Sequence, residues 1–235
     1  MENVTHTLIG VLIGRAAARK DLPVAAAVWT AVIGNNFPDI DFLMRPIFEN
    51  AQLGYLVHHR GYTHTVLAAL PLGLAAGLIG GRLGKAGPEA RARLIALGIG
   101  SVLLHITADF WNNYGVHPFW PFDNHWYYGD FIFIVEPLLW VSMLPFAFAV
   151  AGPRLRWLCG ALVALILGLA WLMPTFPTLV AVWITAWFAA MAWLQHRVGG
   201  LKPAVVAVLA VLAAFGTGGI LAREQVRTSL DTQAR

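Results

Sequence analysis

Long apolar runs dominate this chain and limit what it can fold into. Of its 235 residues, 58% are hydrophobic and 12% are charged. That charged share is about half of the usual value, which is near 25%. Several runs approach or exceed roughly 18 apolar residues, the length that indicates a membrane-spanning helix. Backbone groups in lipid must be paired internally, and the sequence lacks the two-residue alternation of a barrel. It therefore predicts an all-α, polytopic membrane helical bundle.

Glycine, proline and charged residues divide the chain into about eight expected helices. These lie at residues 3–18, 22–37, 64–81, 92–111, 131–151, 155–173, 177–196 and 203–222. The first two are short, at or below the spanning minimum of about 17 residues. We expect residues 1–150 to form a core that carries the polar motifs. Residues 151–222 would add transmembrane helices, and residues 223–235 a polar tail.

Most basic residues fall in one alternating set of expected loops, at 15–21, 82–93, 153–156 and 197–202. Their members are Arg15, Arg19, Lys20, Arg82, Lys85, Arg91, Arg93, Arg154, Arg156, Arg197 and Lys202. Because cytoplasmic loops are rich in Lys and Arg, this pattern predicts that both termini lie outside. The net charge of +4 is then an orientation signal, and we expect no nucleic-acid partner. The single cysteine, Cys159, lies in an apolar run and indicates a buried thiol.

Three polar islands interrupt the apolar sequence. They are Pro-Asp-Ile-Asp at 38–41, His-His-Arg-Gly-Tyr-Thr-His-Thr at 58–65, and His-Ile-Thr-Ala-Asp at 105–109. The predicted topology sends all three, together with His6, to the outer face of the membrane. This common placement favours a single site built from distant segments.

His105 and Asp109 are four residues apart on an expected helix and therefore share one face. Imidazole and carboxylate together suit zinc or another divalent transition metal. An ionisable residue inside a spanning helix is costly and marks a functional candidate. The alternative is a hydrogen-bonded pair that ties helices together.

Asp39 and Asp41 follow Pro38 and are two residues apart. In an extended segment their side chains would point the same way, and a close carboxylate pair favours a cation or a shared proton. The alternative is a solvated turn in which one of them caps the next segment.

His59 and His64 flank Arg60, a planar donor that could hold a phosphate or orient a carboxylate. We expect Thr63 to cap the following helix and His64 to lie in its first turn. The alternative is an interfacial polar loop, and His58 is interpreted as such a bystander. A lone histidine such as His6 is often a packing residue, but its outer position favours a ligand.

The combined set predicts a metal site with open coordination positions. The expected ligands are His6, Asp39, Asp41, His64, His105 and Asp109, enough for one divalent ion or for two ions with a bridging carboxylate. An ion with an open position would acidify a bound water. We expect Arg60 to stabilise developing charge and His59 to act in proton transfer, with Asp41 also a catalytic candidate. The roles of His117, His125 and Glu136 stay open.

The order of these motifs resembles the YdjM-type membrane-bound metal-dependent hydrolases, a family widespread in bacteria. Its most specific element is His-Arg-Gly-Tyr-Thr-His at 59–64, and the resemblance covers roughly residues 1–140. Asn113-Tyr114-Gly115 and Ile134-Val135-Glu136-Pro137 continue it. At the latter motif the family pattern has Asp-Pro, so Glu136 is a conservative departure. The resemblance implies a multi-pass protein of the bacterial inner membrane.

A more distant likeness is to zinc-dependent phospholipase C and the S1/P1-type nucleases. Those all-helical enzymes also use an early His, an Asp, a His and a His-x-x-x-Asp pair. By order, these roles fall on His6, Asp39 or Asp41, His64, and His105 with Asp109. Their second His-x-x-x-Asp/Glu pair has no match here, so the likeness implies one or two zinc ions rather than three.

These patterns together predict a membrane-embedded metal-dependent hydrolase. The favoured substrate is a phosphoester in a lipid or lipid-linked molecule, reached from the outer face. Two alternatives stay open: a proton- or metal-ion-coupled transporter, and a non-catalytic stress-response membrane protein with a structural metal. The sequence leaves the substrate, the metal and the oligomeric state undetermined.

Overall fold

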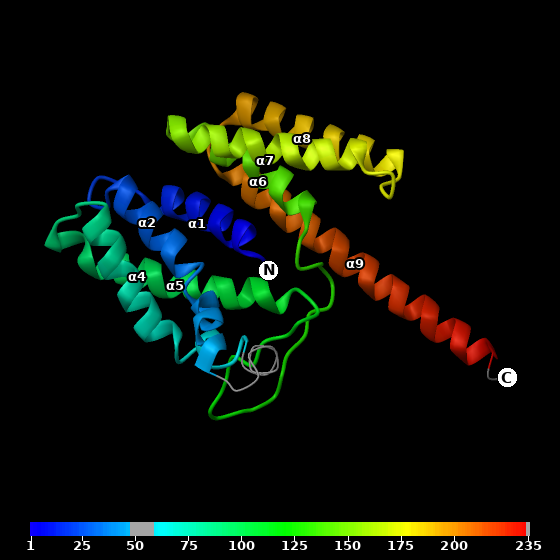
Figure 1. Cartoon of the computed structure of the whole chain (residues 1–235), viewed down its shortest axis with the longest axis horizontal. Coiled ribbons are helices and arrows are strands. Elements are labelled where there is room, and N and C mark those ends of the chain that lie inside the picture. The colour runs from blue at the N-terminus through cyan, green and yellow to red at the C-terminus, as the bar shows by residue number, and fades with distance from the viewer. Residues whose placement is uncertain (48–58, 234–235) are drawn as a thin grey trace.

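The computed structural model describes residues 1–47 and 59–233, and every regular element in these ranges is helical (Figure 1). The expected all-α fold is confirmed. The α-helices are α1 (Asn3–Ala17), α2 (Val24–Gly34), α4 (Ala69–Leu83), α5 (Arg91–Phe110), α6 (Pro137–Val150), α7 (Pro153–Leu172), α8 (Thr178–Val198) and α9 (Lys202–Gln233). Short 3₁₀ helices are η1 (Pro38–Ile47), η2 (Tyr62–His64) and η3 (Pro88–Ala90).

Proline and glycine set several of the helix ends. Pro137 and Pro153 occupy the first turns of α6 and α7, where a missing N–H costs nothing. The side chain of Glu136 caps α6 by accepting from the backbone N–H of Leu138. Gly199 ends α8 with a positive φ of 66°, a conformation that glycine adopts without steric penalty.

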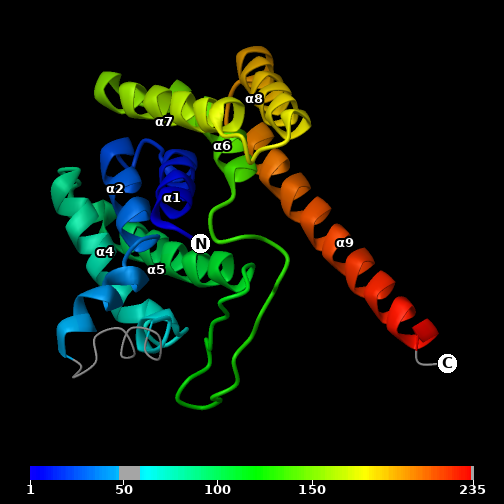
Figure 2. The same cartoon turned by 45° about the vertical axis from the view of Figure 1, so that its right-hand side comes forward.

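The helices form two packed groups. Helices α1, α2, α4 and α5 make one group, and α6, α7 and α8 lie together on its α1 side (Figures 1 and 2). Helix α9 packs against α6 and α8 near its start and then runs away from the other helices. One hydrophobic core joins side chains of α1 with side chains of α6, α7, α8 and α9. The two groups are therefore held together by apolar packing along α1 and α6.

Glycines let the helices of the first group approach closely. A Cβ at Gly98 of α5 would lie 2.2 Å from the carbonyl oxygen of Gly73 in α4. A Cβ at Gly80 of α4 would lie 2.2 Å from Oγ1 of Thr30 in α2. Small residues at such crossings let backbones pack in van der Waals contact within a membrane. This packing fixes α5, which carries the His105–Asp109 pair, against α2 and α4.

Four helical segments are long and apolar enough to cross a membrane: Pro88–Phe110, Pro153–Leu172, Thr178–Val198 and Lys202–Val226. Helices α2, α4 and α6 are apolar but shorter. The fold is consistent with a helical membrane bundle.

Several helix boundaries differ from the sequence prediction. Helix α6 begins at Pro137 rather than residue 131, because the residue before a proline is disfavoured in the helical region. Helix α4 begins at Ala69 rather than residue 64, because Thr65 is extended (φ −109°, ψ 152°). Thr63 therefore does not cap it. Helix α9 continues to Gln233, through the segment expected to be a polar tail.

Candidate metal centre

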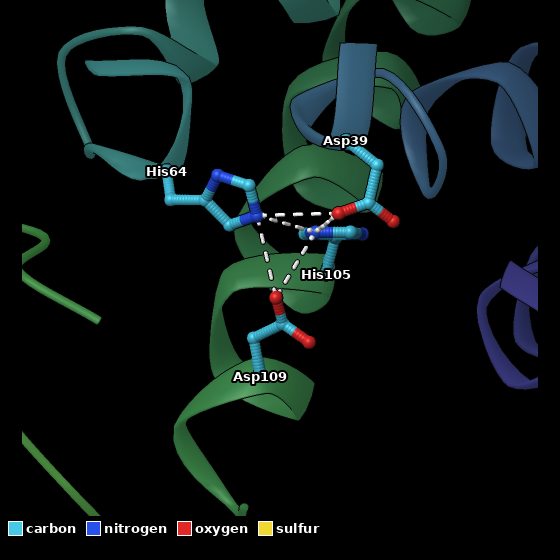
Figure 3. Close-up of side chains that lie close together, drawn as sticks. All are labelled: Asp39, His64, His105 and Asp109. Carbon is cyan, nitrogen blue, oxygen red and sulfur yellow. Dashed lines mark hydrogen bonds and ion pairs between the residues drawn. The ribbon is translucent and has the colours of Figure 1, made fainter. Parts of the chain in front are cut away.

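Four side chains from three distant segments converge on one point (Figure 3). Asp39 comes from η1, directly after α2, and His64 comes from the short η2 turn. His105 and Asp109 come from the last two turns of α5. His64, His105 and Asp109 are fully buried, whereas 14% of the Asp39 side chain is exposed. The arrangement is a buried cluster with one carboxylate at its open edge.

The distances within this cluster are those of a metal coordination sphere. Nε2 of His64 lies 3.1 Å from Nε2 of His105. These two nitrogens lie 3.5 and 3.6 Å from Oδ1 of Asp39, and 3.3 and 3.5 Å from Oδ2 of Asp109. Four ligands placed tetrahedrally at zinc-like bond lengths of about 2.0–2.1 Å would be about 3.3–3.4 Å apart. Five of the six donor–donor distances are therefore close to those expected around one small divalent cation, which these four residues could hold.

The hydrogen bonds of the two imidazoles direct their lone pairs toward this point. Nδ1 of His105 lies 2.7 Å from the backbone carbonyl oxygen of Asn35, so Nδ1 carries the proton. Nδ1 of His64 faces Oγ1 of Thr63 at 3.0 Å and Oδ2 of Asp41 at 3.6 Å. With protons on both Nδ1 atoms, the two Nε2 lone pairs face each other at 3.1 Å. Such a contact is favourable when a cation lies between them, and outer hydrogen bonds of this kind orient metal-binding histidines.

Asp109 is held by a buried arginine. Nε of Arg60 lies 3.0 Å from Oδ2 of Asp109, and Nη1 of Arg60 donates to Oδ1 of Asn112 at 2.8 Å. Oδ2 of Asp109 is buried without a well-aligned hydrogen bond, although it adjoins three cationic or imidazole groups. This unsatisfied oxygen also fits a metal ligand. Arg60 itself is 2% exposed and adopts a positive φ of 63°.

His6 lies beside the cluster rather than in it. Its ring stacks on that of His105 with centroids 3.8 Å apart. Its Nε2 lies 3.3 Å from Oδ1 of Asp109, the carboxylate oxygen that faces away from the four-donor group, and the amino group of Met1 contacts the same oxygen. Of the six predicted ligands, His6 and Asp41 are the two that the four-residue group does not include.

Asp41 instead anchors the 59–64 segment. Its carboxylate accepts from the backbone N–H of Arg60 at 2.9 Å and from Oγ1 of Thr63 at 3.3 Å. Its Oδ1 lies 3.0 Å from Nδ1 of His59. Asp39 and Asp41 thus point to different partners. The expected parallel orientation was wrong because residues 38–47 form a 3₁₀ helix, in which residues two apart lie on different faces.

The electrostatics of the cluster favour a positive charge at its centre. Burial lowers the pKa of His64, but the nearby carboxylates of Asp109 and Asp39 outweigh burial and raise the pKa above its ordinary value. Burial raises the pKa of Asp39, but the hydrogen bond with His64 and the charges of His105 and His6 lower it to about 2. The carboxylate of Asp39 is therefore ionised at neutral pH, and the site attracts a cation.

A cavity of about 360 Å³ adjoins the cluster, and we call it the site cavity. Asp39, His59 and Arg60 line it together with Glu2, Tyr114 and Ile134. Its volume is near the lower end of the range for small-molecule sites, roughly 300–1,000 Å³. The one partly exposed carboxylate of the cluster therefore faces this cavity.

The remaining candidates are not among the four residues of the cluster, although His117 bonds the backbone of Arg60 beside it. His117 stacks on Trp126 at 4.6 Å, and His125 packs edge-on against Tyr127 at 4.8 Å, both in the loop between α5 and α6. Glu136 caps α6, and burial raises the pKa of its carboxyl group. His58 lies outside the described residues.

Three asparagines contribute to the site that the sequence reasoning had not assigned to it. The carbonyl of Asn35 fixes His105, the side chain of Asn112 fixes Arg60, and Nδ2 of Asn3 donates to Oδ2 of Asp39 at 3.1 Å. Only their positions in the sequence could have indicated such a role. Asn35 ends an apolar run just before Pro38, and Asn112 follows the His-x-x-x-Asp motif by three residues.

Comparison with known proteins identifies the family. The profile of the YdjM inner membrane protein family matches residues 1–179. The chain belongs to this family. The YdjM match includes every residue of the cluster, and with the apolar helices it supports a multi-pass inner membrane protein.

A Bacillus subtilis (strain 168) protein, "Uncharacterized protein YfhP", is 30% identical over 151 residues. The match covers 61% of this chain and 44% of YfhP, so the chain spans less than half the length of that relative. No solved structure matches. The distant likeness to phospholipase C and the S1/P1-type nucleases gains no support from these comparisons.

Proposed function

We propose that this YdjM-family protein is a metal-dependent hydrolase, and that its substrate is a phosphoester in a lipid or lipid-linked molecule. The observation that carries the proposal is the four-donor cluster at the wall of the site cavity. Two imidazoles and two carboxylates suit zinc, or a related divalent ion. With these four donors around it, such an ion would take a water or a phosphoryl oxygen as a fifth ligand, and would then lower the pKa of that water or polarise that oxygen.

His59 is the residue that we assign to proton transfer. It lines the site cavity, and its Nδ1 is directed at Asp41, 3.0 Å away. A carboxylate in this position fixes the ring orientation and places the proton on Nδ1, so that Nε2 can accept a proton. In hydrolysis, Nε2 of His59 would take the proton of the attacking water and return it to the leaving oxygen. Asp41 acts as its positioning residue.

Arg60 orients the cluster and supplies positive charge. Its guanidinium pairs with Asp109, bonds Asn112 and lies 4.9 Å from the centre of the Tyr114 ring. Because Arg60 also lines the site cavity, its charge favours an anionic substrate group such as a phosphoryl oxygen.

The proposed orientation places the site toward the outer face of the inner membrane. The connections α1–α2, α4–α5 and α6–α7 lie toward one end of the helices in Figure 1, and the N-terminus and the α5–α6 loop lie away from that end. Those connections and the helix ends beside them carry most of the lysines and arginines, including Arg19, Lys85 and Arg91. Enrichment of basic residues on the cytoplasmic side supports this orientation.

The direct test uses protein purified without chelator. We expect about one equivalent of a divalent metal by elemental analysis, and hydrolysis of a chromogenic phosphodiester and of a labelled phospholipid. His105→Ala should abolish both binding and turnover, while Thr107→Ala, an exposed change on the same helix, should retain both. Ion flux in proteoliposomes without hydrolysis would favour a transporter, and bound metal with neither activity would favour a structural ion.

A further inference from the structure

A second, larger cavity lies among α6, α7, α8 and α9. It has a volume of about 860 Å³, and we call it the apolar cavity. Leu165 and Ala170 of α7, Val180 and Ile184 of α8, and Phe215 of α9 are among the side chains that line it. Its volume is in the upper part of the range for ligand sites, roughly 300–1,000 Å³. Apart from Glu136, whose carboxyl group caps α6, the lining side chains are apolar or aromatic, and a long hydrocarbon chain is the ligand chemistry that such a lining accepts.

The apolar cavity and the site cavity are lined by adjacent residues of one segment. Ile134 lines the site cavity, whereas its neighbours Phe133 and Val135 line the apolar cavity. In this segment before α6, the middle residue of three faces the site cavity, and the residues on either side of it face the apolar cavity. The backbone at residues 133–135 is thus common to the two cavities.

A hydrogen bond across the same boundary gives independent evidence of this contiguity. Trp140 lines the apolar cavity, and its indole N–H donates to Oε1 of Glu2 at 2.8 Å and contacts Oγ1 of Thr5 at 2.9 Å. Glu2 lines the site cavity. The Trp140 side chain therefore reaches from one cavity to the rim of the other.

We propose that the apolar cavity binds the hydrocarbon tail of an amphiphilic phosphoester whose head group occupies the site cavity. The inference rests on the proposed function for the identity of the head group. An amphiphile that lies across Ile134 would place its phosphate beside Asp39, His59 and Arg60, and its chain between α7 and α8. Trp140, with an apolar body and one polar tip, suits the junction between head and tail.

Photocrosslinking tests the tail site without requiring turnover. The probe is phosphatidic acid that carries a diazirine near the end of one acyl chain, added to the full-length protein in detergent micelles. Crosslinks should concentrate on the lining residues between Leu165 and Met173 and between Leu179 and Ile184, and excess unlabelled phosphatidic acid should suppress them. Crosslinks spread evenly over outward-facing residues such as Trp157 and Leu172, and insensitive to competitor, would overturn the proposal.

Cavity-filling variants separate the tail site from catalysis. Ala170→Phe and Ile184→Trp should reduce crosslinking by tenfold or more, and should reduce kcat/KM for a long-chain phospholipid by a similar factor. Hydrolysis of a tail-less chromogenic phosphodiester should change less than twofold. The matched control is Leu158→Trp, an exposed position of α7 outside the lining, which should change neither.

The outcomes distinguish the two proposals. Specific crosslinks without hydrolysis of any phosphoester would keep the tail site and reject the hydrolase. Hydrolysis of the tail-less substrate with unaltered phospholipid turnover in both variants would keep the hydrolase and reject the tail site. Comparable unfolding midpoints of variants and wild type show that a loss of crosslinking comes from the filled cavity. If one of the two variants is unfolded, crosslinking and turnover of the other variant test the tail site.

Discussion

Asp109 connects the groups of the buried polar cluster. Its Oδ2 faces His64, His105 and Arg60, and its Oδ1 faces His6. A carboxylate that is fully buried is costly unless opposite charge and hydrogen bonds compensate for the lost hydration. Here the compensation comes from His64 and the guanidinium of Arg60, both in the 59–64 segment, and from His6 of α1, so one side chain ties two segments to α5.

Asp109→Asn should remove the metal while it preserves the side-chain shape. The neutral amide is a weaker ligand, and it leaves the charge of Arg60 without its partner. We expect the metal content of the purified protein to fall from about one equivalent to below a tenth, measured by elemental analysis. Asp123→Asn, in the exposed part of the α5–α6 loop, is the matched control. Wild-type stoichiometry in Asp109→Asn would remove this residue from the site.

His59→Gln tests proton transfer separately from metal binding. The amide can still bond Asp41, but it cannot accept a proton. We expect metal content to be unchanged and kcat to fall about 10²–10⁴-fold, the usual contribution of a positioned acid or base. His125→Gln, in the α5–α6 loop, should keep wild-type kcat. A wild-type kcat in His59→Gln would assign His59 a structural role only.

The residue types of the cluster were predictable from the sequence. Which of the two neighbouring aspartates joins the cluster was not. Spacing on a helix placed His105 and Asp109 together, because i and i+4 share a face in any α-helix. Asp39 and Asp41 were assigned a common direction that holds only for an extended chain. The turn of η1 separates them, so that Asp39 joins the cluster and Asp41 binds the 59–63 segment.

At the scale of helices, close packing of α4 on α5 positions the two cluster residues of α5, His105 and Asp109. Gly98→Ala would place a methyl group against the Gly73 backbone, whereas Gly100, two residues along the same helix, has nothing within 4 Å of an added Cβ. We expect Gly98→Ala to destabilise the fold by about 1–3 kcal/mol through overpacking.

Gly100→Ala should be neutral or stabilise by about 0.4–1 kcal/mol, because alanine restricts the unfolded chain. Unfolding in detergent, followed by circular dichroism, measures both variants. Equal midpoints would show that the α4–α5 crossing tolerates an added methyl group and does not fix the position of α5.

Helix existence followed from the sequence more reliably than helix ends did. Each expected helix has a counterpart, since an apolar run between breaks can satisfy its backbone in lipid only by coiling. The ends depend on local geometry that composition does not report. Pro137 delays α6 and the extended Thr65 delays α4, whereas nothing in residues 223–233 stops α9.

At the scale of the whole molecule, the orientation can be tested by labelling in intact cells. With Cys159 replaced by Ala, a cysteine at Phe122, which is 89% exposed in the α5–α6 loop, should react with a membrane-impermeant maleimide. A cysteine at Lys85, in the α4–α5 connection, should react only after the cells are opened. The reverse pattern would place the site toward the cytoplasm.

Removal of the metal should lower global stability, because the ligands join α5 to the chain after α2 and to η2. A ligand that binds only the native state stabilises it by about 2.7 kcal/mol at a concentration of 100 Kd. We expect chelation to lower the unfolding midpoint of the wild type, and added metal to restore it. His105→Ala should show no response to either treatment. A wild-type midpoint that chelation leaves unchanged would contradict a bound ion.

The spread of the four donors along the chain has a consequence for biosynthesis. Asp39 and His64 leave the ribosome before His105 and Asp109, and the latter two complete the set only when the end of α5 has been made. Domains generally fold as units during synthesis, at about 5–20 residues per second. If the four donors hold an ion as proposed, a nascent chain that stops short of Asp109 has an incomplete set of donors, and the ion can be captured only after the end of α5 has been made.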